Sequence, residues 1–182
     1  MDSSRLFLAI PFPPGVREPV RRTLPDRLPG RLVPPRNWHL TLRFLGQVAR
    51  PRQESIARVL RNADLGKSRS LRLTRLGGFP DLGRARVLWL WPDKGDVEGV
   101  AGVAAAVDAA LAAAGEPSRN RPFHPHLTLS RLRPPRDLQA LARGFRSGVN
   151  LPVAEVVLFR SVPGGDAPRY ERVESFNLDS EP

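Results

Sequence analysis

The amino-acid sequence contains the tetrapeptide His-Leu-Thr-Leu twice, at residues 39–42 and again at residues 126–129. These copies hold two of the three histidines in the chain. Similar segments surround each copy: an apolar segment typical of a strand and a helical segment come before it, and a helix and a strand follow it. A repeated order of elements predicts a duplicated unit, and hence two similar lobes related by an approximate two-fold axis.

The spacing of apolar residues predicts an α+β fold in which each lobe has a sheet backed by helices. Pro51-Arg52 and Pro135-Arg136 are expected to mark equivalent helix starts. Loops are expected at 77–84 and at 116–125. We expect one bilobal domain over residues 1–182, with approximate repeats at 5–76 and 85–178 and the functional site between the lobes. The expected strands are 5–12, 70–76, 85–92, 153–162 and 169–178, and the expected helices are 14–25, 50–64, 96–115 and 135–145.

Cysteine is absent from the sequence, which excludes disulfides, thiolate nucleophiles and cysteine-rich zinc sites. The apolar run near the N-terminus, residues 6–10, is too short for the core of a signal peptide and far too short to span a membrane. We therefore expect a cytoplasmic protein, without membrane association, that acts as a monomer.

The chain is strongly basic, with a formal net charge of +11. Of its 29 basic residues, only Lys67 and Lys94 are lysines. Arginine forks match the oxygen geometry of phosphates, so this balance favours a polyanionic partner such as RNA. A general preference for arginine codons is the competing interpretation for most of these residues.

Each tetrapeptide displays its polar side chains on one face of a strand. Side chains alternate along a strand, so His39 and Thr41 share one face, while the leucines between and after them share the other. The second copy displays His126 and Thr128 in the same way. Arg43 also lies on the site face by strict alternation, either as a substrate ligand or as a solvated side chain.

Two imidazoles and two hydroxyls that converge in this way suit an in-line displacement at phosphorus. One histidine can take a proton from an attacking water while the other gives a proton to the leaving oxygen, because the ordinary pKa of histidine is about 6.5. The threonine hydroxyls can donate hydrogen bonds to phosphate oxygens. This chemistry requires no metal and no cofactor.

The two motifs resemble a known family. HLTLRFLG (39–46) and FHPHLTLSR (123–131) are similar to the paired His-x-Thr motifs of the two-histidine phosphoesterase superfamily, in particular its RNA 2′,3′-cyclic phosphodiesterase branch, also called the 2′-5′ RNA ligase family. The resemblance extends over almost the whole chain, through the segments RLFLAI, RVLWL and VVLFRSVPGGDAPRY.

The resemblance implies a bilobal fold of two antiparallel sheets flanking a central cleft, with helices outside. It implies metal-independent hydrolysis of an RNA 2′,3′-cyclic phosphate end to a 2′-phosphate. His39 is then the proton donor to the leaving 3′ oxygen, and His126 is the proton acceptor that activates water. Arg131 matches an arginine that holds phosphate in the family. Strict alternation places Arg131 opposite His126, so this role requires a bend in the strand.

Two other interpretations use the same residues. His124, His126 and His39 could supply three imidazoles to a catalytic zinc, although Pro125 interrupts the strand geometry and no acidic residue lies nearby. A non-catalytic RNA-binding module could instead use the arginines for phosphates and stack bases on Trp38, Trp89, Trp91 or Phe123. Binding alone gives no reason for a duplicated His-x-Thr motif. The physiological RNA, the role of His124 and the importance of reverse 2′-5′ ligation are left open by the sequence.

Overall fold

The computed structural model describes residues 3–119 and 122–180, so two residues of the expected loop at 116–125 lie outside it. Helices and strands are interspersed along the chain, with two strands in its middle and three near its C-terminus following one another directly, and the protein has the expected mixture of helices and strands. The helices are α1 (Pro14–Thr23), the 3-10 helix η1 (Pro35–Asn37), α2 (Arg50–Arg61), α3 (Lys94–Ala113) and α4 (Gln139–Gly144). The strands are β1 (Ser3–Pro11), β2 (Arg31–Leu32), β3 (His39–Ala49), β4 (Arg69–Phe79), β5 (Ala85–Pro92), β6 (Leu127–Arg136), β7 (Val149–Val153), β8 (Glu155–Val162) and β9 (Arg169–Asn177).

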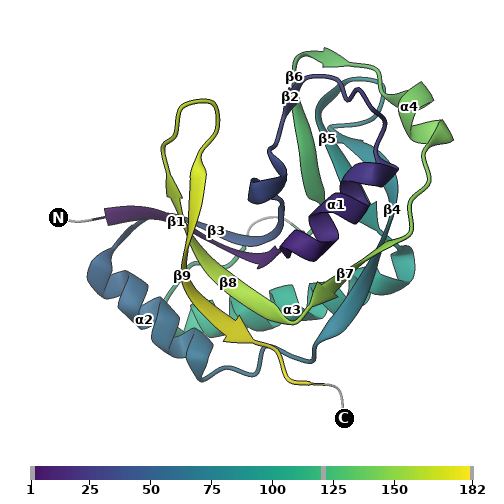
Figure 1. Cartoon of the computed structure of the whole chain (residues 1–182). Helices are drawn as coiled ribbons and strands as arrows, with labels where there is room; N and C mark the ends of the chain where they lie inside the picture. Colours follow the sequence, from purple (N-terminus) through teal and green to yellow (C-terminus); the bar gives the residue numbers. More distant parts are fainter. Residues whose placement is uncertain (1–2, 120–121, 181–182) are drawn as a thin grey trace.

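All of these strands belong to one strongly curled sheet, in the order β7-β4-β5-β6-β3-β1-β8-β9, with β2 paired to β6 (Figure 1). We call β3-β1-β8-β9 the His39 half and β7-β4-β5-β6 the His126 half. The expectation of two separate antiparallel sheets is wrong, because β3 and β6 pair with each other and make the two halves continuous.

The junction between the halves is a single residue pair. Leu40 of β3 is the antiparallel partner of Leu127 of β6. These leucines hold the same place in the two tetrapeptides, so the motifs run past each other in opposite directions about a local two-fold axis. The His126 half includes β4 from the first part of the sequence, and the His39 half includes β8 and β9 from the second part.

The core forms on the face of the sheet opposite the polar tetrapeptide side chains. Leu40, Leu88, Leu90 and Leu127 are almost completely buried there. Helices α2 and α3 pack against β3, while α1 contacts β7 and α4 contacts β4 (Figure 1). Within the described part of the chain, no helix combines the length and apolar character needed to cross a membrane.

Several expected boundaries were wrong. Strand β4 continues to Phe79, into the expected loop at 77–84. The strand expected at 153–162 begins as β8 at Glu155, and Val153 ends the separate short strand β7. Strand β6 continues to Arg136, so Pro135-Arg136 is not a helix start, and α4 is shorter than the expected helix at 135–145.

Candidate active site

The junction between the halves brings both His-x-Thr pairs onto one face of the sheet. Leu40 and Leu127 point into the core, so the neighbouring residues of each tetrapeptide point the other way. His39, Thr41, His126 and Thr128 are all half-buried on this second face. The sequence prediction that these four side chains share a face is therefore confirmed, and antiparallel pairing of the two tetrapeptides is the physical reason.

Both imidazoles are held by the same local contact. His39 Nδ1 lies 2.7 Å from the backbone carbonyl of Asn37, and His126 Nδ1 lies 2.7 Å from that of His124. A carbonyl only accepts hydrogen bonds, so each Nδ1 carries a proton and donates it. In the neutral ring, Nε2 then has a free lone pair. Each histidine is thus fixed in the tautomer that can accept a proton at Nε2.

Aromatic side chains surround each imidazole. In the His39 half, the ring of His39 packs against Phe7 at 5.0 Å and edge-on against Tyr170 at 5.3 Å between centroids. In the His126 half, the ring of His126 meets Phe79 at 5.4 Å and Trp89 at 6.4 Å. These contacts limit the rotation of both rings and shield them from water.

This shielding disfavours the charged form of both histidines. Burial lowers the pKa of His39 from 6.5 to about 4, although the Asn37 carbonyl acts in the opposite direction. Burial also lowers the pKa of His126, again opposed by a backbone carbonyl, that of His124. Both rings are therefore predominantly neutral at neutral pH in the free protein.

A β-bulge in β6 carries Arg131 to the face of the histidines. Trp89 pairs with Thr128 and Val87 pairs with Arg131, so β6 has one more residue than β5 between these pairs. Val87 and Trp89 share a face of β5, and their partners share that face too. After burial, the charge of Arg131 is among the causes that lower the pKa of both histidines. The bend that a phosphate contact from Arg131 requires is therefore present.

An equivalent bulge in β3 moves Arg43 away from the site. Ala9 pairs with Thr41 and Leu8 pairs with Arg43, which puts Thr41 and Arg43 on opposite faces of the sheet. Arg43 instead forms an ion pair with Asp108 of α3, at 3.2 Å, and donates a hydrogen bond to the carbonyl of Pro117. The expectation that Arg43 lies on the site face is therefore wrong, because strict alternation does not hold across a bulge.

Three residues near His39 were not predicted. Buried Asn37 donates a hydrogen bond from Nδ2 to the carbonyl of Pro168, at 2.7 Å, and so ties the backbone that holds His39 to the segment before β9. Tyr170 packs on His39, and burial raises the pKa of its hydroxyl. Phe44 is 68% exposed. It follows His39 at the same interval as Arg131 follows His126, so a search for equivalent positions could have found it.

The three-imidazole alternative has no support from the arrangement of side chains. Across residues 3–119 and 122–180, no group of three or more histidine and acidic side chains is arranged to hold a metal ion. The exposed ring of His124 lies beside Trp91, at 6.2 Å between centroids, and it is the backbone of His124 that contacts His126.

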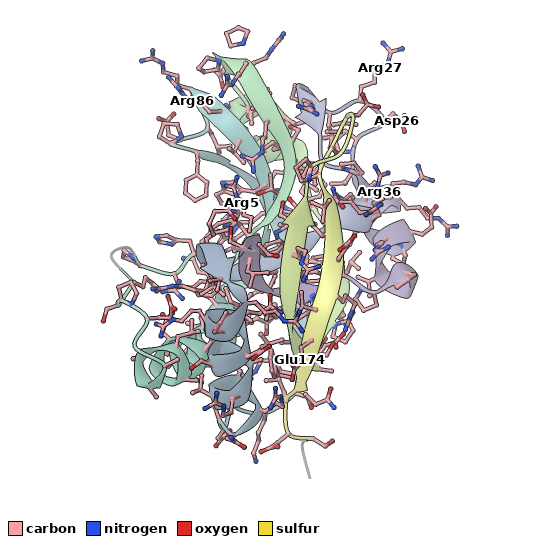
Figure 2. All side chains as sticks on the ribbon, turned by 90° about the vertical axis from the view of Figure 1, so that its left-hand side faces the viewer. Arg5, Asp26, Arg27, Arg36, Arg86 and Glu174 are labelled. Carbon is pink, nitrogen blue, oxygen red and sulfur yellow. The ribbon has the colours of Figure 1, made fainter. Side chains whose placement is uncertain are left out.

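The positive charge of the chain is distributed over much of its surface. Figure 2 shows Arg27, Arg36 and Arg86 projecting outward from different parts of the molecule. Other arginines form exposed ion pairs with acidic residues, such as Arg21 with Glu18. Arg131 is distinguished from these arginines by its place on the face of the two histidines.

The sequence matches the family model described as LigT-like phosphoesterase twice, over residues 12–89 and 90–170. An RNA 2′,3′-cyclic phosphodiesterase of Thermus thermophilus is 34% identical over 97% of this chain and 91% of its own length. The protein of the same name from Escherichia coli is 33% identical over 71% of this chain and 73% of its own length.

Solved structures show the same fold. Escherichia coli LigT in complex with 3′-AMP superposes with a TM-score of 0.75 and 29% identity, covering 97% of this chain and 99% of that one. A protein of Thermus thermophilus gives a TM-score of 0.76 and 30% identity, again over 97% and 99% of the two chains. The sequence, the arrangement of its two His-x-Thr motifs and these similarities agree, and the chain belongs to the LigT-like phosphoesterases of the two-histidine phosphoesterase family.

Proposed function

We propose that this protein hydrolyses the 2′,3′-cyclic phosphate end of RNA to a 2′-phosphate, without a metal ion. The antiparallel pair Leu40–Leu127 is the observation that carries the proposal, because it brings two tautomerically fixed histidines onto one face. Relatives that span most of this chain are named RNA 2′,3′-cyclic phosphodiesterase, which supports the choice of substrate.

In the proposed reaction, the two histidines act on opposite sides of one phosphorus atom. His126 Nε2 accepts a proton as water attacks the phosphorus. The bond between phosphorus and the 3′ oxygen breaks, and that oxygen receives a proton from His39 Nε2. The product keeps its phosphate on the 2′ oxygen. Both imidazoles have the same hydrogen-bonding arrangement, so the assignment of the two roles rests on the family resemblance.

The acid role requires a second proton on His39, whose pKa is about 4 in the free protein. A bound phosphodiester carries a negative charge, and a nearby negative charge favours the protonated imidazole. Substrate binding therefore raises the pKa of His39 and loads the acid. In this proposal, the substrate itself creates the protonation state that its cleavage requires.

Three further side chains of the same face would hold the phosphate. Thr41 and Thr128 are half-buried on this face, and each can donate a hydroxyl hydrogen bond to a non-bridging oxygen. Arg131 would neutralise the charge that develops on these oxygens, because a guanidinium matches two phosphate oxygens at once.

We also propose that the chain is a single bilobal domain with a substrate cleft where its two halves meet. The repeats at 5–76 and 85–178 would have arisen by duplication. The twofold match to one family model and the antiparallel pairing of equivalent leucines support this origin. In this arrangement, the site exists only when both repeats are folded together.

The decisive assay uses an RNA oligonucleotide that ends in a 2′,3′-cyclic phosphate, incubated with the protein in the presence and absence of a chelator. We expect equal turnover in both samples and a product that resists a phosphatase specific for 3′-phosphate, with a 2′-monoester signal in phosphorus NMR. Binding without turnover would favour an RNA-binding module. A 3′-phosphate product would keep the two-histidine chemistry and exchange the roles of the two histidines.

A further inference from the structure

Beyond His126, the site face of the His126 half carries a row of aromatic and basic side chains. Trp89 pairs with Thr128 on one side and with Gly77 on the other, and Trp91 pairs with Arg75. Direct partners share a face, so Trp89, Trp91 and Arg75 lie on the same face as Thr128. The row therefore begins at the proposed phosphate site and leads away from it across β5 to β4.

The two tryptophans differ in their surroundings. Trp89 is held over the backbone of Gly77, where a Cβ atom would overlap its indole ring. Trp91 lies next along the row, 4.8 Å from Trp89 between ring centroids, and is half-buried beside the exposed Arg75. Leu90 is buried in the core from the opposite face of β5, and Trp91 is not one of the buried core residues. The indole of Trp91 can thus offer part of its surface to a ligand.

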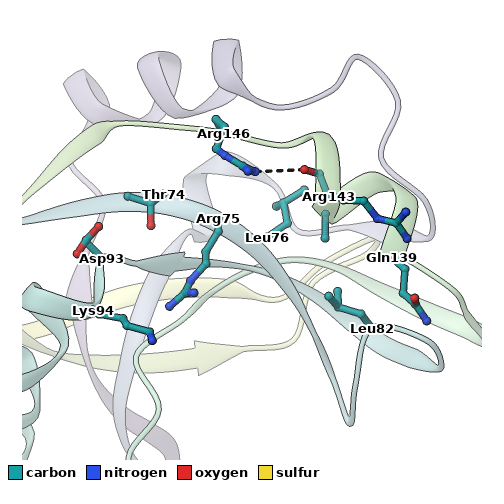
Figure 3. A pocket seen from close by; sticks show the side chains of 10 residues that line it. Thr74, Arg75, Leu76, Leu82, Asp93, Lys94, Gln139, Arg143 and Arg146 are labelled. Atoms are coloured by element: carbon teal, nitrogen blue, oxygen red, sulfur yellow. Dashed lines mark hydrogen bonds between the residues drawn. The ribbon is translucent and has the colours of Figure 1, made fainter.

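Arg75 also lines a pocket of about 670 Å³ at the edge of β4, where the pairing with β7 ends. Figure 3 shows Arg75 and Lys94 on one side of this pocket, and Arg143 and Arg146 on the other side. In the described part of the chain, Arg75, Lys94 and Arg143 form no ion pair. The one acidic side chain of the lining, Asp93, accepts a hydrogen bond from the backbone of Gly95. The lining therefore carries a net positive charge, because it has four basic side chains and one carboxylate.

We propose that Trp91, Arg75 and Lys94 form a binding site for an RNA segment outside the reacting nucleotide. Bases stack on aromatic rings without regard to sequence, and basic side chains follow the phosphates, which is the usual combination for single-stranded nucleic acid. One base would stack on Trp91, and a neighbouring phosphate would lie between Arg75 and Lys94. This inference rests on the proposed function and gives it a substrate class: oligonucleotides in preference to small cyclic nucleotides.

The test compares a nucleoside 2′,3′-cyclic phosphate with an oligonucleotide that ends in the same nucleotide. In the wild-type protein we expect a higher kcat/KM for the oligonucleotide. Trp91→Ala and Arg75→Glu should each lower its kcat/KM by about tenfold or more, as loss of a stacking or phosphate contact does. Hydrolysis of the mononucleotide should change by less than about twofold, since it does not reach the row.

Arg58→Glu is the matched control, because Arg58 is an exposed arginine on α2 and its reversal changes the net charge equally. This variant should retain the preference for the oligonucleotide. The inference would be overturned if Arg75→Glu and Arg58→Glu lowered kcat/KM equally for both substrates. It would also be overturned if Trp91→Ala and Arg75→Glu kept the full preference for the oligonucleotide.

Failure of the proposed function can be separated from failure of this inference. If neither substrate is hydrolysed, the proposed function fails, and the anisotropy of a labelled oligonucleotide still measures binding. Weaker binding in Arg75→Glu than in Arg58→Glu then supports the RNA site, and equal binding overturns it. The wild-type protein could show no preference for the oligonucleotide and yet join an added strand with a 5′-hydroxyl end to the cyclic phosphate end. If Trp91→Ala lowers the rate of this joining, the site binds the second RNA strand. A response in neither assay overturns the inference.

Discussion

At the scale of the residue, each catalytic candidate is defined by the contact that its other ring nitrogen makes. The backbone carbonyl two positions before each histidine accepts a hydrogen bond from Nδ1–H, which leaves the lone pair of Nε2 free for chemistry. Asn37 and His124 have different side chains, but each provides its backbone carbonyl to the histidine two positions later. The tautomer is therefore set by the backbone path into each tetrapeptide, and a substitution at either position can preserve it.

The lowered histidine pKa values predict an acidic optimum for the free enzyme. A competent free enzyme needs one charged and one neutral imidazole, and this form becomes more populated as the pH falls below the ordinary histidine pKa of about 6.5. With the pKa of His39 at about 4 and that of His126 also lowered, kcat/KM should be greatest below pH 6.5.

In the proposed complex, the negative charge of the substrate phosphate should raise the pKa of both histidines, so the maximum of kcat should lie at a higher pH than the maximum of kcat/KM. Initial rates over a pH series, at saturating and at low substrate concentrations, measure the two profiles. A kcat/KM maximum above about pH 7.5 would contradict the desolvated environment assigned to the histidines.

Arg131 and Arg43 form a matched pair for testing which arginine serves the phosphate. Arg131→Ala should lower kcat/KM by about 10-fold to 100-fold, the effect of losing one hydrogen bond between charged groups. Arg43→Ala should keep kcat/KM within about twofold and lower Tm instead, because it removes a largely buried ion pair with Asp108. Steady-state kinetics and thermal unfolding of both variants test this. A large loss of kcat/KM in Arg43→Ala with none in Arg131→Ala would contradict the assignment.

These two arginines also mark the limit of prediction from sequence at this scale. Alternation placed the histidines and threonines correctly, because each pair is separated by one residue with no irregularity between them. It failed for Arg43, which follows the bulge in β3. A one-residue bulge leaves no clear signal in a single sequence, and it reverses the direction of every later side chain on the strand.

At the scale of the element, the equivalent bulges in β3 and β6 determine which side chains surround the proposed phosphate site. Each bulge follows a threonine and returns the fifth residue after the histidine to the site face: Phe44 in one half and Arg131 in the other. The two halves thus share a geometry and differ in chemistry. One supplies an exposed aromatic ring, and the other supplies a cation.

Strand β4 supports the site through Gly77, which lies under the indole of Trp89. Gly77→Ala should displace Trp89 from its place beside His126, with a loss of about 1–3 kcal/mol in the free energy of unfolding, as for other overpacked sites. Turnover should fall in the same variant. Circular dichroism with denaturant and tryptophan fluorescence measure the stability and the position of the ring.

Gly102→Ala is the matched control, since Gly102 lies in α3 with no atom near its added Cβ. Alanine is the better helix former, so this variant should gain up to about 1 kcal/mol. Unchanged stability and fluorescence in Gly77→Ala would mean that the strand does not hold Trp89 as described.

The element order was predictable, while some boundaries were not. Strand β5 and the long helix α3 have clear periodic patterns and were placed to within two residues. Helix α4 was expected to begin at Pro135, but the ladder between Ala85 and Arg136 keeps that segment in β6. The pairing of this segment with β5 outweighed its local preference for a helix, and such tertiary pairing cannot be seen in the pattern of a single sequence.

At the scale of the whole molecule, one curled sheet places the two His-x-Thr motifs beside each other, and helices cover its core face. The repeated tetrapeptide predicted two related halves that meet at the site. It did not predict that β3 and β6 pair directly. Only one residue pair, Leu40–Leu127, joins the two halves in the described part of the chain, and so short a contact has no pattern of its own in the sequence. The repeated tetrapeptide is visible in the sequence, whereas the continuity of the sheet depends on how the folded halves meet.

The high net charge predicts a salt-dependent interaction with RNA. Each phosphate that the protein neutralises releases counterions, so the affinity for a single-stranded oligonucleotide should fall linearly in a plot of log K against log salt, with a slope of about −0.7 per phosphate contacted. Fluorescence anisotropy at several salt concentrations measures this slope. A flat response would show that the charge of +11 is not used to bind RNA.

The most direct test of the two-histidine site is the turnover of the RNA cyclic phosphate by His39→Ala and His126→Ala. Each folded variant should lose about two to four orders of magnitude in kcat, because each lacks a positioned acid or base. His124→Ala is the control, since it keeps the backbone carbonyl that holds His126 and should retain most of the turnover. Near-wild-type turnover in either His39→Ala or His126→Ala, with the fold intact, would contradict the mechanism.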